Sequence, residues 1–190
     1  PTEETVARAM PAARRALQLA PGLAEAHASM GLVLENTADL AGAAQCFRRA
    51  LQLNPGYTMA LVWYGLVLVK QGQFREAARR NLEALQLDPL SPIINVNVGF
   101  DALRWGDTAQ ATASFTTAVE IDPGFPVSHY GLARAYCLQG DFDSAVREID
   151  ESLRHAPDRA YYHAQKSLIL LQAGQTEAAA KSVEEACGLS

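Results

Sequence analysis

Apolar residues recur along this chain in short segments with helical spacing, and polar turns separate one segment from the next. Residues 58–91 show the pattern most clearly. Apolar residues crowd the first twelve positions, Gly72 interrupts them, and a second amphipathic run from Phe74 ends just before Asp88 and Pro89. A helix normally ends before a proline, because the proline ring disfavours helical backbone in the preceding residue. The pattern therefore predicts two helices, each roughly 20 Å long, joined by a turn.

The same pattern returns every 34 residues, which makes the chain an array of repeats. Position 20 of each repeat is alanine, position 27 is alanine or serine, and position 8 is glycine, alanine or serine. Small residues at fixed places in such a period indicate a helical solenoid, in which helix backbones approach closely and each repeat packs against its neighbours. Aromatic residues at position 24 are expected to fill the space between repeats. Five prolines set the phase: Pro21, Pro55, Pro89, Pro123 and Pro157.

This phase divides the chain into repeats that together predict one all-α domain, an α–α superhelix of antiparallel hairpins. The first 23 residues form a partial repeat, and the last repeat ends without a capping helix. The expected boundaries are 1–23, 24–57, 58–91, 92–125, 126–159 and 160–190.

Two segments conflict with a simple reading of this phase. Residues 93–98 alternate β-branched and polar side chains, which by itself favours a strand. We predict a helix there, because Gly99, Ala111, Phe115 and Pro123 all keep their places in the repeat.

Pro11 falls where a second helix should run, and an interior proline removes a hydrogen bond. We therefore expect a helix over 11–19 that starts at Pro11, with a separate turn or short helix over 2–9.

These residues resemble the tetratricopeptide repeat over essentially the whole chain. The resemblance implies a helical solenoid that binds a protein or peptide and has no catalytic role. Residues 10–27 also resemble the arrays attached to bacterial regulators, cyclases and kinases, and the 13 arginines against three lysines are typical of a GC-rich bacterial genome. In the repeat over 126–159, Ile149 replaces the aromatic residue of the family pattern at position 24. The residues in the family positions of this repeat are His129, Leu132, Ala133, Tyr136, Ala145, Ile149, Ser152 and Pro157.

No combination of residues predicts catalysis, a metal site or a cofactor. Cys46, Cys137 and Cys187 are far apart and fit neither a zinc spacing nor a disulfide framework. The histidines at position 4 of three repeats occupy a slot for a large packing side chain. We expect packing histidines and reduced thiols, and no catalytic or metal-binding residue.

The resemblance places the partner-binding groove on the first helices, at positions 2, 5, 9 and 12 of each repeat. These positions are strongly apolar in the middle of the chain, and an exposed apolar patch of this kind usually marks an interaction site. The alternative is that the superhelix buries several of these side chains between hairpins. The predicted groove residues are Met59, Val62, Leu66, Ile93, Val96, Phe100, Val127, Tyr130, Arg134 and Tyr161.

Charge is distributed unevenly along the chain. Residues 1–95 carry a net charge of +1 and residues 96–190 carry −6. The outward positions 25 and 26 of the repeat hold arginine pairs near the start of the chain and acidic pairs near its end, for example Arg48-Arg49 and Glu184-Glu185. This polarity is either a solvated face or the basis of head-to-tail association, in which the apolar face of the last helix contacts another copy. The acidic net charge disfavours nucleic-acid binding.

Three classes of function remain. We favour a protein-interaction scaffold, and the alternatives are a self-association module or the regulatory arm of a larger bacterial enzyme or transcription regulator. The longest apolar run, residues 59–69, is too short to span a bilayer, and no basic-then-apolar segment opens the chain. We therefore expect a cytoplasmic location and no membrane contact within these residues.

Overall fold

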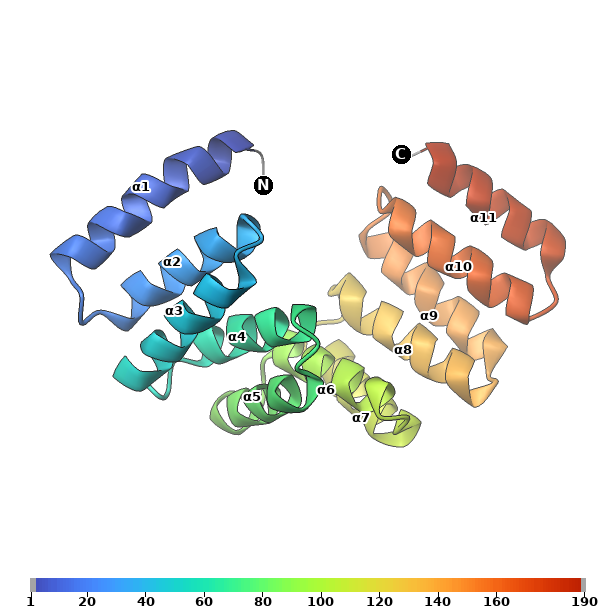
Figure 1. Ribbon diagram of the computed structural model, residues 1–190. Coiled ribbons are helices and arrows are strands. Elements are labelled where there is room, and N and C mark those ends of the chain that lie inside the picture. The colour runs from blue at the N-terminus through green and yellow to red at the C-terminus, as the bar shows by residue number, and fades with distance from the viewer. Residues whose placement is uncertain (1–2, 189–190) are drawn as a thin grey trace. The chain divides into compact units, whose positions relative to one another are not determined.

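The computed structural model describes residues 3–188, and the side chains of residues 8–188. Within residues 3–188 the fold consists of eleven helices with no strand, which confirms the predicted all-α solenoid (Figure 1). The helices are α1 Glu3–Leu19, α2 Ala24–Asn36, α3 Leu40–Leu53, α4 Thr58–Lys70, α5 Phe74–Leu87, α6 Pro92–Arg104, α7 Thr108–Ile121, α8 Pro126–Gln139, α9 Phe142–His155, α10 Ala160–Gln172 and α11 Thr176–Gly188.

Each 34-residue repeat forms one helical hairpin. The helices α2, α4, α6, α8 and α10 are the first helices of their repeats, and α3, α5, α7, α9 and α11 are the second helices. The strand-like segment 93–98 lies inside α6, so the repeat phase predicted its conformation correctly. Helical packing decides the outcome here, because Ile94, Val96 and Val98 are all buried in the array.

The turn inside each hairpin uses one residue with a left-handed backbone. Gly72, Gly106, Gly140 and Gly174 stand at position 15 of their repeats and have φ between 74° and 80°. Glycine adopts this conformation without the steric penalty that a Cβ atom brings. In repeat 24–57 the same position is Ala38, with a φ of 62°. This repeat therefore makes the same turn with backbone strain.

The core is built from aromatic rings seated against glycines and alanines. Phe47 and Phe115 are fully buried, as predicted for position 24. A Cβ atom added at Gly131 would lie 2.3 Å from the ring of Phe115, and one added at Gly99 would lie 2.6 Å from it. Both first helices, α6 and α8, therefore approach this ring through a glycine. The position 20 alanines of α3, α5, α7 and α9 are completely buried, which confirms that they mark close helix contacts.

The prediction of a break at Pro11 was wrong. Helix α1 runs without interruption from Glu3 to Leu19, with Pro11 inside it. Pro11 is exposed, so its ring lies on the solvent side of α1. Ala13 is buried and packs with Met30 and Val33 of α2, while Met10 and Leu17 pack around them. The contacts of this apolar stripe hold the helix together despite the hydrogen bond that proline removes.

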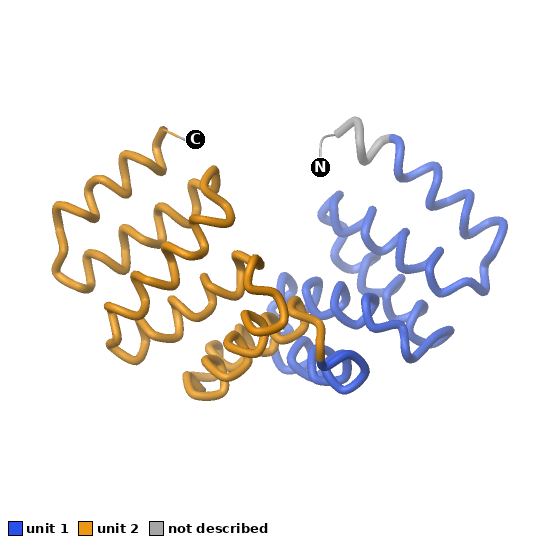
Figure 2. The backbone as a smooth tube through the Cα atoms, turned by 180° about the vertical axis from the view of Figure 1, so that it is seen from behind, with its two compact units in different colours: residues 1–89 blue, residues 90–190 orange. Residues whose placement is uncertain are grey.

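The chain divides into two compact units, residues 1–89 and 90–190, which Figure 2 shows in different colours. In unit 1, consecutive helices from α1 to α5 pack together, and the first helices α2 and α4 also touch. In unit 2, consecutive helices from α6 to α11 pack together, and α6 touches α8. That residues 1–190 form one continuous superhelix stays a prediction. None of the helices within residues 3–188 is long and apolar enough to cross a lipid bilayer.

Candidate functional site

The predicted groove residues of unit 1 lie on α4 and differ in exposure. Met59 and Leu66 are exposed, whereas Val62 is only 2% exposed. Val62 therefore contributes to the packing of unit 1 and is not available for direct contact with a partner. The apolar surface that α4 offers is limited to two separated side chains.

The predicted groove residues of unit 2 fall into three classes. Val96 is 1% exposed and packs with Phe115, so it belongs to the core. Ile93, Val127 and Phe100 are half-buried, and Tyr130 is buried apart from its edge. The two exposed members are Arg134 of α8 and Tyr161 of α10.

An aromatic cluster connects these half-buried and exposed residues. The ring centroids of Phe100 and Tyr130 are 6.0 Å apart, and those of Tyr130 and Tyr161 are 5.5 Å apart. The hydroxyl oxygens of Tyr130 and Tyr161 lie 2.7 Å from each other, within hydrogen-bond distance. Phe100 also packs edge-on against the buried ring of Phe115, at 5.0 Å between centroids. The cluster therefore links the surface of α8 and α10 to the core of α6 and α7.

Arg134 is placed over two of these rings. Its guanidinium carbon lies 6.0 Å from the ring centroid of Phe100 and 5.9 Å from that of Tyr130. Cations at this distance over an aromatic ring are attracted by its negative face. The guanidinium group makes no ion pair with any of the described residues. Arg134 therefore holds a positive charge in place at the edge of an apolar surface.

Two side-chain hydrogen bonds fix α8 beside α10 on either side of Arg134. One is the bond between the hydroxyls of Tyr130 and Tyr161, and the other runs from the Cys137 thiol to the Gln172 side-chain oxygen, at 2.6 Å. Arg134 lies between these two contacts along α8, and its guanidinium group lies over Phe100 of α6 and Tyr130 of α8.

The exposed face of α10 carries three large apolar side chains. Tyr161, Leu168 and Leu171 are 55%, 54% and 50% exposed, and their spacing places them on one side of the helix. The repeat phase puts both leucines at inner positions, although the predicted groove did not include them. We call the combined face of α6, α8 and α10 the aromatic surface: Phe100, Tyr130, Arg134, Tyr161, Leu168 and Leu171.

Burial raises the pKa of two titratable groups near the aromatic surface. Burial is the main cause that raises the pKa of Tyr130, and the hydrogen bond with Tyr161 adds to it. Burial also raises the pKa of the Cys137 thiol, which keeps it protonated and poorly nucleophilic. Among the described residues, no group of three or more His, Cys, Asp or Glu side chains could hold a metal ion.

Comparison with solved structures shows the same fold in other helical-repeat proteins. A chain of the APC/C hetero-tetramer Cut9-Hcn1 has a TM-score of 0.90 at 16% identity, and the match covers 98% of this chain and 37% of that chain. PilF from Pseudomonas aeruginosa has a TM-score of 0.80 at 24% identity, covering 94% and 82%. YrrB, described as a TPR protein with an unusual peptide-binding site, has a TM-score of 0.68 at 17% identity, covering 94% and 92%. No curated protein sequence matched the chain.

Sequence models of protein families also match this chain. One tetratricopeptide repeat model matches residues 102–169, and a second matches residues 24–57. Together they cover more than half of the chain, in both compact units. The hairpins, the buried alanines and the glycine-seated aromatic rings are the structural form of the pattern that these models describe. The chain belongs to the tetratricopeptide repeat family.

Proposed function

We propose that this chain is a non-catalytic protein-interaction scaffold whose aromatic surface binds an extended or helical segment of a partner protein. The observation that carries the proposal is the exposed apolar face of α10, with Tyr161, Leu168 and Leu171 each half exposed or more. Tetratricopeptide repeat proteins typically act as scaffolds for protein or peptide partners. A contiguous apolar face on a folded protein usually marks such a contact.

The energetics of the aromatic surface favour this role. Full burial of a fully exposed leucine contributes about 1.5–3 kcal/mol. Because Leu168 and Leu171 are each about half exposed, a partner that covers both gains roughly the equivalent of one such leucine. Tyr161 is already held by its hydroxyl contact with Tyr130, so ordering it on binding costs little side-chain entropy. Rigid aromatic side chains and arginines are the residue types that most often anchor protein interfaces.

Arg134 favours a partner segment that carries an acidic side chain. Its guanidinium group is held over Phe100 and Tyr130 and has no acidic partner among the described residues. A carboxylate on the bound segment would pair with it at the edge of the apolar face. We therefore propose a segment with apolar side chains at helical or alternating spacing and one acidic side chain beside them.

Selection from a random dodecapeptide display library tests this proposal. The chain is immobilised, enriched peptides are synthesised, and their affinities are measured by fluorescence anisotropy. We expect enriched peptides with two or more apolar residues and one acidic residue. Leu168→Asp should weaken their binding at least tenfold, because it places a charge in the middle of the apolar face. Arg134→Gln should weaken mainly the peptides with an acidic residue.

Leu82→Asp is the matched control, because Leu82 is an equally exposed leucine on α5 in unit 1. It should leave peptide affinity unchanged within a factor of two. Thermal melts of all three variants check that they fold. Enriched peptides that bind Leu168→Asp as tightly as the parent would mean that the aromatic surface is not the binding site.

A second candidate function, self-association, is favoured by the exposed side of α11. Only Ala179 and Ser182 of this helix are buried, and Val183 is exposed beside Glu184. In this candidate, the face of α11 contacts another copy of the chain. Sedimentation velocity of the parent and of Val183→Lys across a range of concentrations tests it. A concentration-dependent assembly that Val183→Lys abolishes supports self-association, whereas one unchanged species in both proteins contradicts it.

A further inference from the structure

Three repeats use the histidine at position 4 for the same backbone hydrogen bond. The Nε2 atoms of His27, His129 and His163 each lie 2.9 Å from the carbonyl oxygen of the proline six residues earlier. A carbonyl oxygen only accepts hydrogen bonds, so Nε2 carries the hydrogen in all three. The other ring nitrogen, Nδ1, is left for a second contact, and it donates a hydrogen bond only when the ring is protonated.

In two of these repeats Nδ1 meets a carboxylate. The distance from Nδ1 of His129 to Glu148 of α9 is 2.8 Å, and from Nδ1 of His163 to Glu185 of α11 it is 3.1 Å. Glu148 occupies position 23 of its repeat, and Glu185 occupies position 26. The fold thus has a place for an acidic group beside this histidine. In unit 2 the chain's own Glu148 and Glu185 occupy this place in two repeats.

Repeat 24–57 has no acidic group at these positions. Position 23 is Cys46 and position 26 is Arg49, so the charge beside His27 is inverted. No hydrogen-bond partner for Nδ1 of His27 exists among the described residues. Burial, and secondarily the charge of Asp39, raises the pKa of the Cys46 thiol, so the thiol stays neutral and does not replace the carboxylate.

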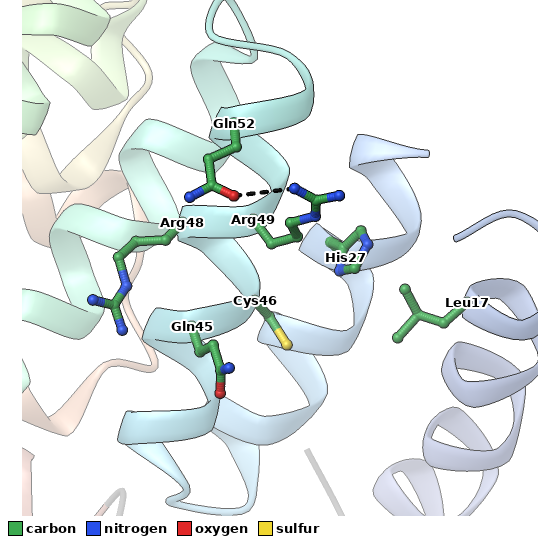
Figure 3. Close-up of a pocket in the computed structure, with 7 residues that line it drawn as sticks. All are labelled: Leu17, His27, Gln45, Cys46, Arg48, Arg49 and Gln52. Atoms are coloured by element: carbon green, nitrogen blue, oxygen red, sulfur yellow. Dashed lines mark hydrogen bonds between the residues drawn. The ribbon is translucent and has the colours of Figure 1, made fainter. Parts of the chain in front are cut away.

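A pocket of about 550 Å³ opens at this place, between α1 and α3 over α2. Figure 3 shows Arg49, Cys46 and His27 around the space that separates α3 from Leu17 of α1, with Arg48 farther round α3. Arg49 donates to the side-chain oxygen of Gln52, at 3.2 Å. Neither Arg48 nor Arg49 makes an ion pair with another described residue. The lining residues are Leu17, His27, Gln45, Cys46, Arg48, Arg49 and Gln52.

We infer that this pocket binds an acidic side chain of a protein partner, which takes the place that Glu148 and Glu185 fill in the other repeats. The carboxylate would accept hydrogen bonds from the Arg49 guanidinium and from Nδ1 of His27 in the protonated ring, because Nε2 already donates to the Pro21 carbonyl oxygen. Arg48 attracts the acidic segment, and Leu17 offers an apolar contact beside it. This site lies in unit 1 and is independent of the proposed role of the aromatic surface in unit 2.

The blocked pentapeptide AELEA and its neutral counterpart AQLQA serve as probes in an NMR titration of the full chain. AELEA should shift the signals of His27, Cys46 and Gln52 in a saturable way, and AQLQA should bind at least tenfold more weakly. Arg49→Gln should reduce the affinity for AELEA tenfold or more. The effect should also weaken as salt rises, because the pocket is open to solvent.

Cys46→Glu gives the sharpest variant, because it restores an internal carboxylate at position 23, as in Glu148. This variant should not bind AELEA, and its midpoint of thermal unfolding should equal or exceed that of the parent. Cys46→Ser keeps the position neutral and should retain binding. Arg75→Gln removes an exposed arginine of unit 1 outside the pocket and should change the affinity less than twofold. Equal binding of AELEA and AQLQA, or undiminished binding to Arg49→Gln and Cys46→Glu, would overturn the inference.

Discussion

Repeats 24–57 and 126–159 have the same backbone and the same histidine, but they surround it with opposite charge. His27 and His129 both bond to a proline carbonyl oxygen at 2.9 Å. Around His129 stand Glu148 and Glu151 of α9, with the ring of His155 stacked at 6.0 Å. His27 instead borders a pocket lined by arginines.

This difference separates two roles that one residue can have in a repeat. The bond from Nε2 belongs to the fold, because it joins the start of one hairpin to the turn before it. The group beside Nδ1 belongs to the individual repeat, because it comes from the second helix and varies in sequence. A histidine with an internal carboxylate is a stability element. We propose that a histidine without one is available for recognition.

Removal of the histidine is expected to produce the largest difference between the two repeats. His129→Ala should reduce the free energy of unfolding by about 3 kcal/mol, because it removes a buried ring and two hydrogen bonds, one of them to a carboxylate. His27→Ala should cost about 1 kcal/mol, since this ring is half-buried and makes one hydrogen bond. Urea unfolding measures both values. Equal costs would show that the Glu148 contact adds nothing to stability.

Neutralisation of the internal carboxylate should have the next largest effect. Glu148→Gln keeps the shape of the side chain but removes the charge that pairs with His129 at 2.8 Å. We expect a loss of about 1–2 kcal/mol, within the range for hydrogen bonds to charged groups. The same substitution at Glu185 is the control, because this carboxylate is more exposed and should contribute less than about 1 kcal/mol. A larger loss at Glu185 would contradict the ranking by burial.

The hairpin turns offer a comparison in which a substitution in repeat 24–57 is expected to increase stability. Ala38 has a φ of 62° where repeat 126–159 has Gly140 with a φ of 80°. Ala38→Gly should raise the free energy of unfolding by about 1 kcal/mol, because it removes the strain of a left-handed alanine and the strain outweighs the added entropy of glycine in the unfolded chain. The midpoint of thermal unfolding reports the gain. Gly140→Ala should show the reverse change, and a gain there would refute the role of strain.

The smallest expected effect is a pH dependence of stability that comes from His129. The hydrogen bond with Glu148 is the largest of the causes that raise the pKa of His129 above its ordinary value of 6.5. A group whose pKa is higher in the folded state stabilises the fold fully below its unfolded pKa, and this contribution is lost as the pH rises through the folded pKa. We therefore expect stability to decline as the pH is raised from about 6 into the mildly alkaline range. Glu148→Gln should flatten the decline, and an equally steep profile would exclude His129 as its source.

Most helix positions could be predicted from the sequence, because local signals and the repeat phase agree. Gly72 and Pro89 mark the ends of the two helices in repeat 58–91: α4 ends at Lys70, just before Gly72, and α5 ends at Leu87, just before Pro89. The repeat phase also decided α6 correctly, where the local alternation of residues 93–98 pointed to a strand. Pro11 shows the limit of local rules, since contacts of Ala13 with α2 keep α1 intact around an exposed proline.

The candidate site could be predicted less well, because exposure depends on the neighbouring helices. Val96 and Leu168 both hold inner positions of first helices, yet Val96 is in the core and Leu168 is exposed. The repeat phase gives the side of the helix on which a residue lies. It does not give the depth to which the next hairpin covers it.

By itself the sequence determined the family, the helical hairpins and the small residues that let them pack, because these features recur at fixed spacing and act over one or two turns of helix. The tertiary structure alone decided that Arg134 lies over Phe100 and Tyr130, and that His27 borders a pocket whereas Nδ1 of His129 meets Glu148. The physical reason is distance along the chain. These contacts join side chains from different helices, where the direction and depth of each side chain follow from packing and not from the period of the repeat.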